Sequence, residues 1–127
     1  MSIEYSVSQN GSRIETFPKS ELSVEETIDC FDRLANDNKI IKGATEIVNF
    51  KYVTDFKFSS SEALKITRNY LTPKTTKMIG VTIFVCETDH AYVIGNMMQA
   101  YHKFTNPRHK VVVVRSEGEV EKAINEL

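Results

Sequence analysis

The sequence predicts an α/β domain built on a mostly parallel five-stranded sheet, and three observations lead to this prediction. Alternating apolar and polar residues flank Asn10-Gly11, a pattern typical of a β-hairpin. After residue 23, segments with helical periodicity alternate with short apolar runs, as they do in βα units. Two of these runs, 78–85 and 111–114, contain almost no polar residues, which indicates strands covered on both faces.

Length and composition agree with one soluble domain over residues 1–127. The chain has 16 basic and 17 acidic residues and a formal net charge of -1, which does not favour binding to nucleic acid. No stretch approaches the ~18 apolar residues of a membrane span, and the first residues lack the pattern of a signal peptide. We therefore expect a cytoplasmic protein without a membrane span.

The N-terminal half is expected to hold the hairpin, a helix and a central strand. Folding the chain at Asn10-Gly11 places Val7 opposite Ile14, and Pro18 then ends the second strand. A helix should begin near Ser23 and end in the polar cluster 36–38. We expect the central strand at 46–50 and a loop over 51–58.

The C-terminal half is expected to continue with helix and strand in alternation. Ser59 and Glu62 have the spacing of a capping box for a second helix, and Ser116 and Glu119 have the same spacing before the last helix. Run 78–85 should be a central strand. A third helix capped by Thr88 or Asp89 should extend to about residue 104, before strand 111–114. The predicted order is a hairpin followed by (αβ)3α.

This order, with EIVNFKYVTDF at 46–56 and VVVVRSEGEVEKAI at 111–124, resembles the SpoIIAA-like, or STAS-like, domains over nearly the whole chain. The resemblance implies βα units wound as a superhelix, with helices mainly on one side of the sheet. It implies relatives that are anti-sigma-factor antagonists, cytosolic parts of anion transporters, or domains without an assigned role. In the antagonists, a serine that follows an aspartate at the start of a helix is phosphorylated by a partner kinase.

The corresponding region here, 55–61, reads DFKFSSS, so the Asp-Ser step is missing. Asp55, Ser59, Ser60 and Ser61 are nevertheless the candidates for a switch or a partner-facing segment. A serine with a glutamate three residues later is also an ordinary helix cap. A phosphate on Ser59 or Ser60 would lie at the positive end of the helix, where it could order the loop or repel a partner.

Other chemistry is not indicated. The five glycines are scattered, so the sequence has neither a dinucleotide fingerprint nor a phosphate loop. His102 and His109 could approach each other across the turn at Pro107, but neither has a thiol or carboxylate at ligand spacing. Cys30 and Cys86 should be reduced and partly buried, and acidic neighbours should raise the pKa of Cys86. We expect no metal, no cofactor and no catalysis.

The third helix carries more apolar residues than a helix covering a sheet needs. Its apolar residues are either buried between neighbouring elements or form a contact surface. If the helices cover one side of the sheet, then the hairpin, this helix or a second copy must cover the other side. The candidate homodimer contacts are Val93, Met97, Met98, Tyr101 and Phe104.

Two hypotheses of function follow. The first is a regulatory or protein-interaction module in which segment 51–61 faces the partner. The alternative is a domain that binds a small apolar or anionic ligand, lipid-like or nucleotide, at the carboxyl ends of the strands. The residues expected to gather at that edge are Tyr52, Phe56, Cys86, Thr88 and Arg115.

Overall fold

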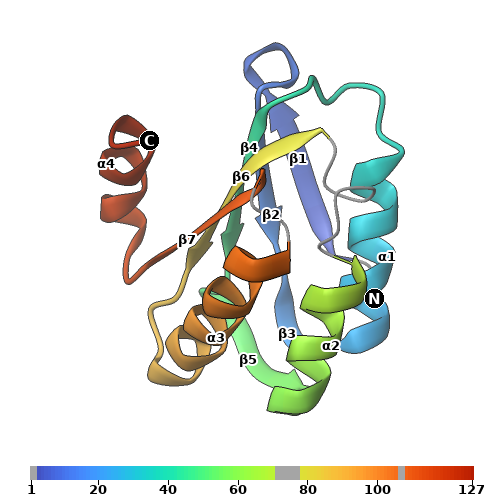
Figure 1. Ribbon diagram of the computed structural model, residues 1–127, viewed down its shortest axis with the longest axis vertical. Coiled ribbons are helices and arrows are strands. Elements are labelled where there is room, and N and C mark those ends of the chain that lie inside the picture. Colours follow the sequence, from blue (N-terminus) through green and yellow to red (C-terminus); the bar gives the residue numbers. More distant parts are fainter. Residues whose placement is uncertain (1–2, 71–77, 106–107) are drawn as a thin grey trace.

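The computed structural model describes residues 3–70, 78–105 and 108–127, with the side chains of residues 70, 104 and 105 left out. The expected dimer contact of Phe104 therefore lies outside the described side chains. The main sheet has five strands in the order β1-β2-β4-β6-β7, as Figure 1 shows. The strands are β1 (Glu4–Ser8), β2 (Arg13–Phe17), β4 (Ala44–Asn49), β6 (Ile79–Val85) and β7 (Lys110–Val114). Only β1 and β2 are antiparallel, which confirms the predicted mostly parallel sheet.

The hairpin has the predicted register, with Val7 paired to Ile14. Its turn is longer than a two-residue turn, because Gln9 joins Asn10 and Gly11 at positive φ. A side chain at Gly11 would collide with the carbonyl oxygen of Lys39, so the turn needs glycine for space as well as for its backbone conformation.

The segment 51–58 contains a strand, so the predicted loop is wrong. Strand β5 (Tyr52–Lys57) pairs in parallel with β3 (Lys19–Ser23) in a separate two-stranded sheet. Pro18 has no N–H for a ladder and separates β3 from β2. Val53 and Phe56 of β5 both pack on the larger core although they are three residues apart, and the register of the β3–β5 pair shifts between them.

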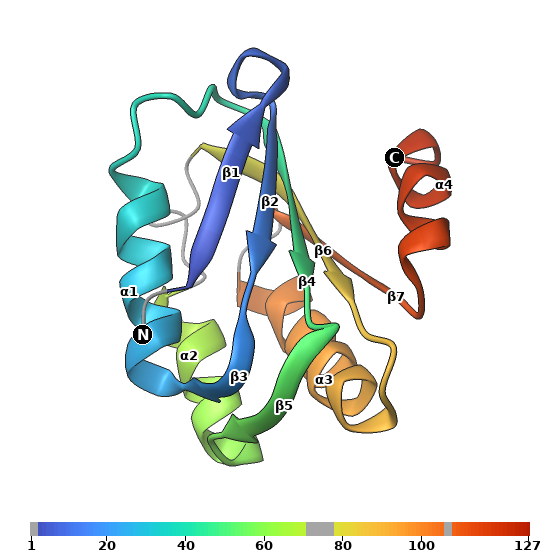
Figure 2. The ribbon, with the colours of Figure 1, turned by 180° about the vertical axis from the view of Figure 1, so that it is seen from behind.

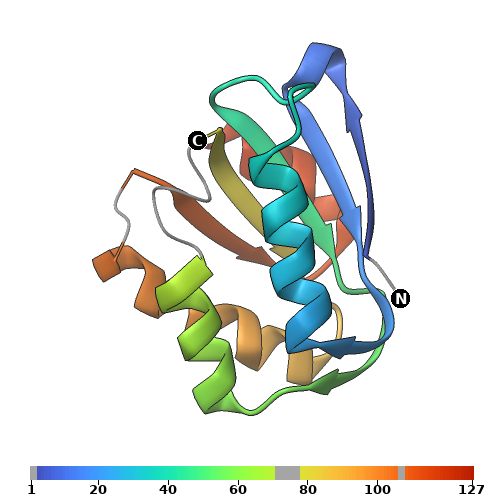
Figure 3. The ribbon, with the colours of Figure 1, turned by 90° about the vertical axis from the view of Figure 1, so that its right-hand side faces the viewer.

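Three helices lie on one face of the main sheet and the fourth on the other, as Figures 2 and 3 show. The three are α1 (Val24–Ala35), α2 (Ser60–Tyr70) and α3 (Asp89–Thr105), and the fourth is α4 (Val120–Asn125). Val120 of α4 packs with Ile47, Ile83, Val85 and Val114. The second face therefore has a cover in this chain that we did not expect, and the case for a second copy over that face is weaker.

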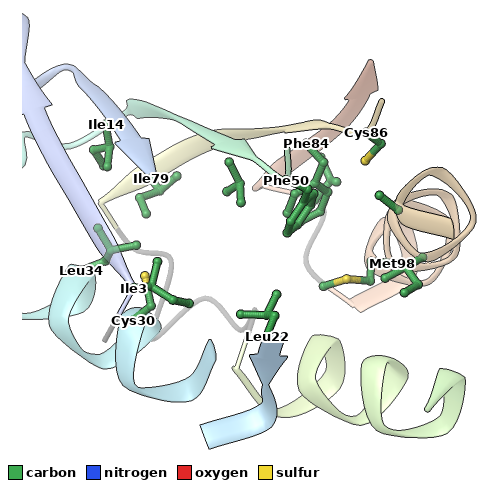
Figure 4. Close-up of a cluster of buried hydrophobic side chains, with 14 of the residues drawn as sticks. Ile3, Ile14, Leu22, Cys30, Leu34, Phe50, Ile79, Phe84, Cys86 and Met98 are labelled. Atoms are coloured by element: carbon green, nitrogen blue, oxygen red, sulfur yellow. The ribbon is translucent and has the colours of Figure 1, made fainter. Parts of the chain in front are cut away.

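The larger core fills the space between the sheet and α1 to α3, and Figure 4 shows part of it. Phe50, which follows β4, and Phe84 of β6 face Met98 of α3, while Cys30 and Leu34 of α1 face Ile14 and Ile79. Helix α1 begins where expected, and the Ser23 hydroxyl there accepts from the amide of Glu26. Of the two expected caps of α3, Thr88 is the one observed, because its hydroxyl accepts from the amide of Ala91. Residues Ser116 and Glu119 form the predicted capping box.

Candidate functional site

The serine segment lies where β5 ends and α2 begins. The hydroxyl of Ser59 accepts from the amide of Glu62 at 3.1 Å, and the carboxylate of Glu62 accepts from the amide of Ser59 at 3.0 Å. These two bonds confirm the predicted capping box, so Ser59 has a structural role. Ser60 and Ser61 are exposed in the first turn and take no part in the box.

Asp55 points away from the core on β5 and forms an ion pair with Lys57 at 3.0 Å. Lys57 also lies 3.7 Å from Glu21 on β3. The hydrogen bond from Lys57 lowers the pKa of Asp55. The surface that precedes the serines therefore carries a small charged cluster across β3 and β5.

Three of the expected ligand-edge residues gather around the start of α3. Arg115 pairs with Asp89 at 2.9 Å, and its guanidinium lies 4.4 Å from the ring centre of Tyr92. Thr88 caps the helix, and Cys86 is fully buried against Gly95. Burial raises the pKa of Cys86 to about 12, and the positive charge of Arg115 opposes this rise only in part. The predicted direction is correct, but the cause is burial rather than acidic neighbours.

The other two expected edge residues, Phe56 and Tyr52, both lie on β5 but have different surroundings. Phe56 is buried and reaches the start of α3 through His90, with 5.3 Å between the ring centres. Tyr52 is 57% exposed and lies beside the ammonium group of Lys51. The five residues therefore line no common pocket among those found in the described part of the chain.

Most of the candidate contact residues on α3 that have described side chains are buried or partly buried. Met98 is buried, and Met97 packs against the same core cluster. Tyr101 is half-buried, whereas Val93 is 62% exposed. Val93 is thus the one proposed dimer contact with a described side chain that is mainly exposed.

A buried polar chain crosses the sheet beneath α1 to α3. Glu46 on β4 accepts a hydrogen bond at 2.8 Å from the hydroxyl of Thr16 and one at 3.4 Å from the hydroxyl of Thr82. The hydroxyl of Thr82 lies 2.8 Å from Nε2 of His109. His109 Nδ1 lies 2.8 Å from Nε2 of His102, so the two histidines do approach each other, which the sequence had left open as a possibility.

A backbone carbonyl group determines the direction of the hydrogen bonds in this polar chain. His102 Nε2 lies 2.9 Å from the carbonyl oxygen of His109, which only accepts, so Nε2 carries the hydrogen. His109 Nδ1 then accepts from the same N–H, and its Nε2–H donates to Thr82. The Thr82 hydroxyl is left to donate to Glu46. All donors therefore point toward one carboxylate.

Burial changes the proton affinity at both ends of the chain. It raises the pKa of Glu46 to about 6, although the bonds from Thr16 and Thr82 oppose the change. Burial and the neighbouring His102 lower the pKa of His109 to about 4, and burial lowers the pKa of His102. At pH 7 the histidines are neutral and Glu46 is mainly ionised.

A cavity of about 50 Å³ lies beside Glu46, between the sheet and α1 to α3. Its polar lining residues are Glu46, Thr16, Thr27 and Thr82, and the rest of its wall is mainly aliphatic and aromatic. A volume of this size holds on the order of three water molecules or a ligand of a few heavy atoms. This site was not predictable from the sequence, because Glu46 precedes an apolar run and its partners come from distant strands. Among residues 3–70, 78–105 and 108–127 no cluster of side chains is suited to hold a metal ion.

No family model matches the chain, and no curated protein matches it. One similar structure is an uncharacterised protein of the DUF3478 family with a SpoIIAA-like fold, from Shewanella loihica PV-4. It has a TM-score of 0.58 and 10% identity, over 96% of this chain and 91% of that one. A second is the anti-sigma factor antagonist SpoIIAA in its unphosphorylated form, with a TM-score of 0.55 and 10% identity, over 99% of this chain and 100% of that one.

Both similarities extend over nearly the whole chain. None of the helices described is long and apolar enough to cross a membrane. At this level of identity the likeness concerns the fold, and it agrees with the hairpin, the parallel strands and the helices described above. The chain therefore has a SpoIIAA-like fold.

Proposed function

We propose that the protein is a cytoplasmic, non-catalytic regulatory module that binds a protein partner through segment 51–61. The observation that carries the proposal is the exposure of Ser60 and Ser61 in the first turn of α2, outside the capping box formed by Ser59. Modification of either serine can change the surface without removing the cap of the helix.

The chemistry of this position suits a phosphate switch. A phosphate adds about -1.5 to -2 charges at pH 7, and the first turn of a helix favours negative charge. Lys57 lies on the adjacent strand, paired with Asp55. A phosphate on Ser60 would add negative charge three residues after this lysine and so change the charge on the partner-facing surface.

The test compares Ser60→Asp and Ser60→Ala with the wild-type protein purified from its source cells together with bound partners. We expect native mass spectrometry to detect a partner with wild type and Ser60→Ala, and to lose it with Ser60→Asp. The thermal midpoint should stay within a few degrees, as for a surface change below ~1 kcal/mol.

The matched control is Ser59→Ala, which removes the cap and should cost about 1 kcal/mol while the partner stays bound. Equal partner occupancy in all four proteins would contradict a switch at Ser60. A partner lost only with Ser59→Ala would assign the effect to stability.

A second function, the binding of a small ligand, is favoured by the cavity beside Glu46. An ionised carboxylate with an apolar surround suits a small ligand with one hydrogen-bond donor and an apolar body. A lipid-like ligand or a nucleotide needs more volume than 50 Å³, and so needs α1 to α3 to move. Mass spectrometry after solvent extraction of the purified protein tests this function, and an extract without any stoichiometric small molecule would count against it.

We also propose self-association through the exposed side of α3 around Val93, as a homodimer. The variant Val93→Glu should reduce the sedimentation coefficient at micromolar concentration. The matched control is Ile41→Glu, because Ile41 is an exposed apolar residue away from α3. A wild-type chain that remains a monomer at ~100 μM, above the dissociation constant of an ordinary specific interface, would refute this part of the proposal.

A further inference from the structure

Strand β7 is the last strand of the main sheet, and no described segment pairs with its outer side. The amide of Cys86 donates to the carbonyl of Val114 at 2.8 Å, so Val114 directs its backbone groups toward β6. Backbone direction alternates along a strand in a parallel ladder. Val111 and Val113 therefore direct their N–H and C=O groups toward the open side.

Only part of this open edge is satisfied within the described chain. The side chain of Gln99 on α3 donates to the carbonyl of Val111 at 2.9 Å. The N–H of Val111 and both backbone groups of Val113 have no hydrogen-bond partner among the described residues. This pattern of groups is the one that an added extended strand would bond.

The edge lies in a groove between α3 and α4, and Figure 1 shows β7 running between these two helices. A hollow of about 740 Å³ lies along the first half of β7, and one of about 370 Å³ lies along the second half. Val112 lines both hollows, so they follow each other along the strand. Gln99 and Tyr92 contribute the α3 wall, and Ala123 contributes to the α4 wall.

The rim of this groove is basic although the whole chain has a net charge of -1. The lining includes five basic side chains, Lys103, Arg108, Lys110, Arg115 and Lys122, and two acidic ones, Glu119 and Glu126. Arg115 is paired with Asp89, and Glu119 is engaged in the cap of the last helix. The four other basic side chains are exposed and have no ion pair among the described residues.

We propose that the β7 groove binds an extended acidic segment of a partner protein, which adds to the sheet as a sixth strand. The open backbone groups supply the hydrogen bonds, and the basic rim selects the charge. A second copy of this chain fits poorly, because pairing two β7 edges would bring two basic rims together. The groove shares no residue with segment 51–61, so the two proposals can fail separately.

The experiment uses the full chain labelled with ¹⁵N and a panel of nine-residue peptides in which glutamate alternates with valine or threonine. One control peptide carries lysine in place of glutamate. A second control keeps the charge but has N-methyl groups on alternate amides, so that it cannot complete a strand. We expect the acidic peptides to shift the amide signals of Val111 and Val113 and to slow their hydrogen exchange, with neither effect for the controls.

Charge variants test the rim. The double variant Lys110→Glu and Lys122→Glu should weaken binding of the acidic peptides at least about tenfold, and added salt should weaken it in the wild type. Lys65→Glu, an exposed change on α2, should leave binding unchanged. Retained ¹⁵N spectra of the variants exclude unfolding as the cause.

Several outcomes would overturn the proposal. These are no shift at Val111 and Val113 with any acidic peptide at 1 mM, the concentration of a very weak interaction, or equal binding of the N-methylated control. Concentration-dependent shifts of the same amides without peptide would assign the edge to a second copy of the chain. Binding of a single-stranded oligonucleotide in place of the peptides would assign the basic rim to nucleic acid.

Discussion

The substitution Glu46→Gln should make the protein more stable at neutral pH, although it removes a charged group that accepts two hydrogen bonds. Glu46 is buried, with its carboxylate bonded by the hydroxyls of Thr16 and Thr82. Its partners are neutral, so ionisation leaves an uncompensated charge in the core. Glutamine has nearly the same shape and no charge.

The magnitude follows from the pKa of Glu46, which burial raises from 4.5 to about 6. Below pH 4.5 the carboxyl is protonated in both states, and the raised pKa costs nothing. Between pH 4.5 and 6 the folded state holds the proton that the unfolded state has lost, so stability falls as pH rises. The full cost above pH 6 is about 2 kcal/mol, at 1.36 kcal/mol per pKa unit.

The histidine end of the polar chain affects the pH dependence of stability in the opposite direction. His109 has a pKa lowered from 6.5 to about 4, so its contribution is present at neutral pH and is lost as pH falls through this range. This loss is common to wild type and Glu46→Gln. The difference between the two proteins therefore isolates Glu46.

Urea denaturation between pH 4 and 7.5 measures this difference. We expect the free energy of unfolding of Glu46→Gln, minus that of the wild type, to increase by about 2 kcal/mol between pH 4 and 7. Thr16→Val removes a bond that lowers the pKa of Glu46, so the decline of stability should still begin near pH 4.5 but extend above pH 6. A difference that does not change with pH would refute the assignment of a raised pKa to Glu46.

Two further predictions concern the backbone and the thiols. Gly11→Ala should destabilise the folded protein by about 2 kcal/mol or more, because the new methyl group would collide with the carbonyl oxygen of Lys39 at a residue that already has a positive φ. Gly43→Ala should cost only about 1 kcal/mol, because Gly43 has a similar φ of 89° but no atom lies within 4 Å of the added methyl group. Urea unfolding of both variants tests the collision, and equal costs would contradict it. Burial raises the pKa of Cys30 and of Cys86 to about 12, so a thiol reagent at pH 8 should modify neither in the folded protein and both in urea; rapid modification in the folded state would show that the core opens.

The fold was predictable because its signals are local. The hairpin turn at Asn10-Gly11, the serine caps and the apolar runs each act within about ten residues, and the order of these elements defines the class. The strand at 52–57 was missed because its pairing with β3 depends on a distant segment and on the break at Pro18. The position of α4 was missed because periodicity identifies the apolar side of a helix but not the face of the sheet that it covers.

The same difference between local and distant signals explains which parts of the candidate sites were predictable. The Ser59 cap was predictable from a glutamate three residues later, whereas the exposure of Ser60 follows from how α2 packs. The grouping of Cys86, Thr88 and Arg115 was predictable because parallel strands end at one edge. Tyr52 failed to join them because β5 leaves the main sheet.

The polar chain connects two hollows that are otherwise separate. Glu46 and Thr82 line the interior cavity, while His102 and His109 line the larger hollow along β7. Thr82 is the only described link between the carboxylate and the histidines, because its hydroxyl donates to Glu46 and accepts from His109. The carboxylate and the histidines are therefore joined through one hydroxyl group. Since buried hydrogen bonds are expensive to leave unmade, the polar chain fixes the relative position of β2, β4, β6 and the residue before β7.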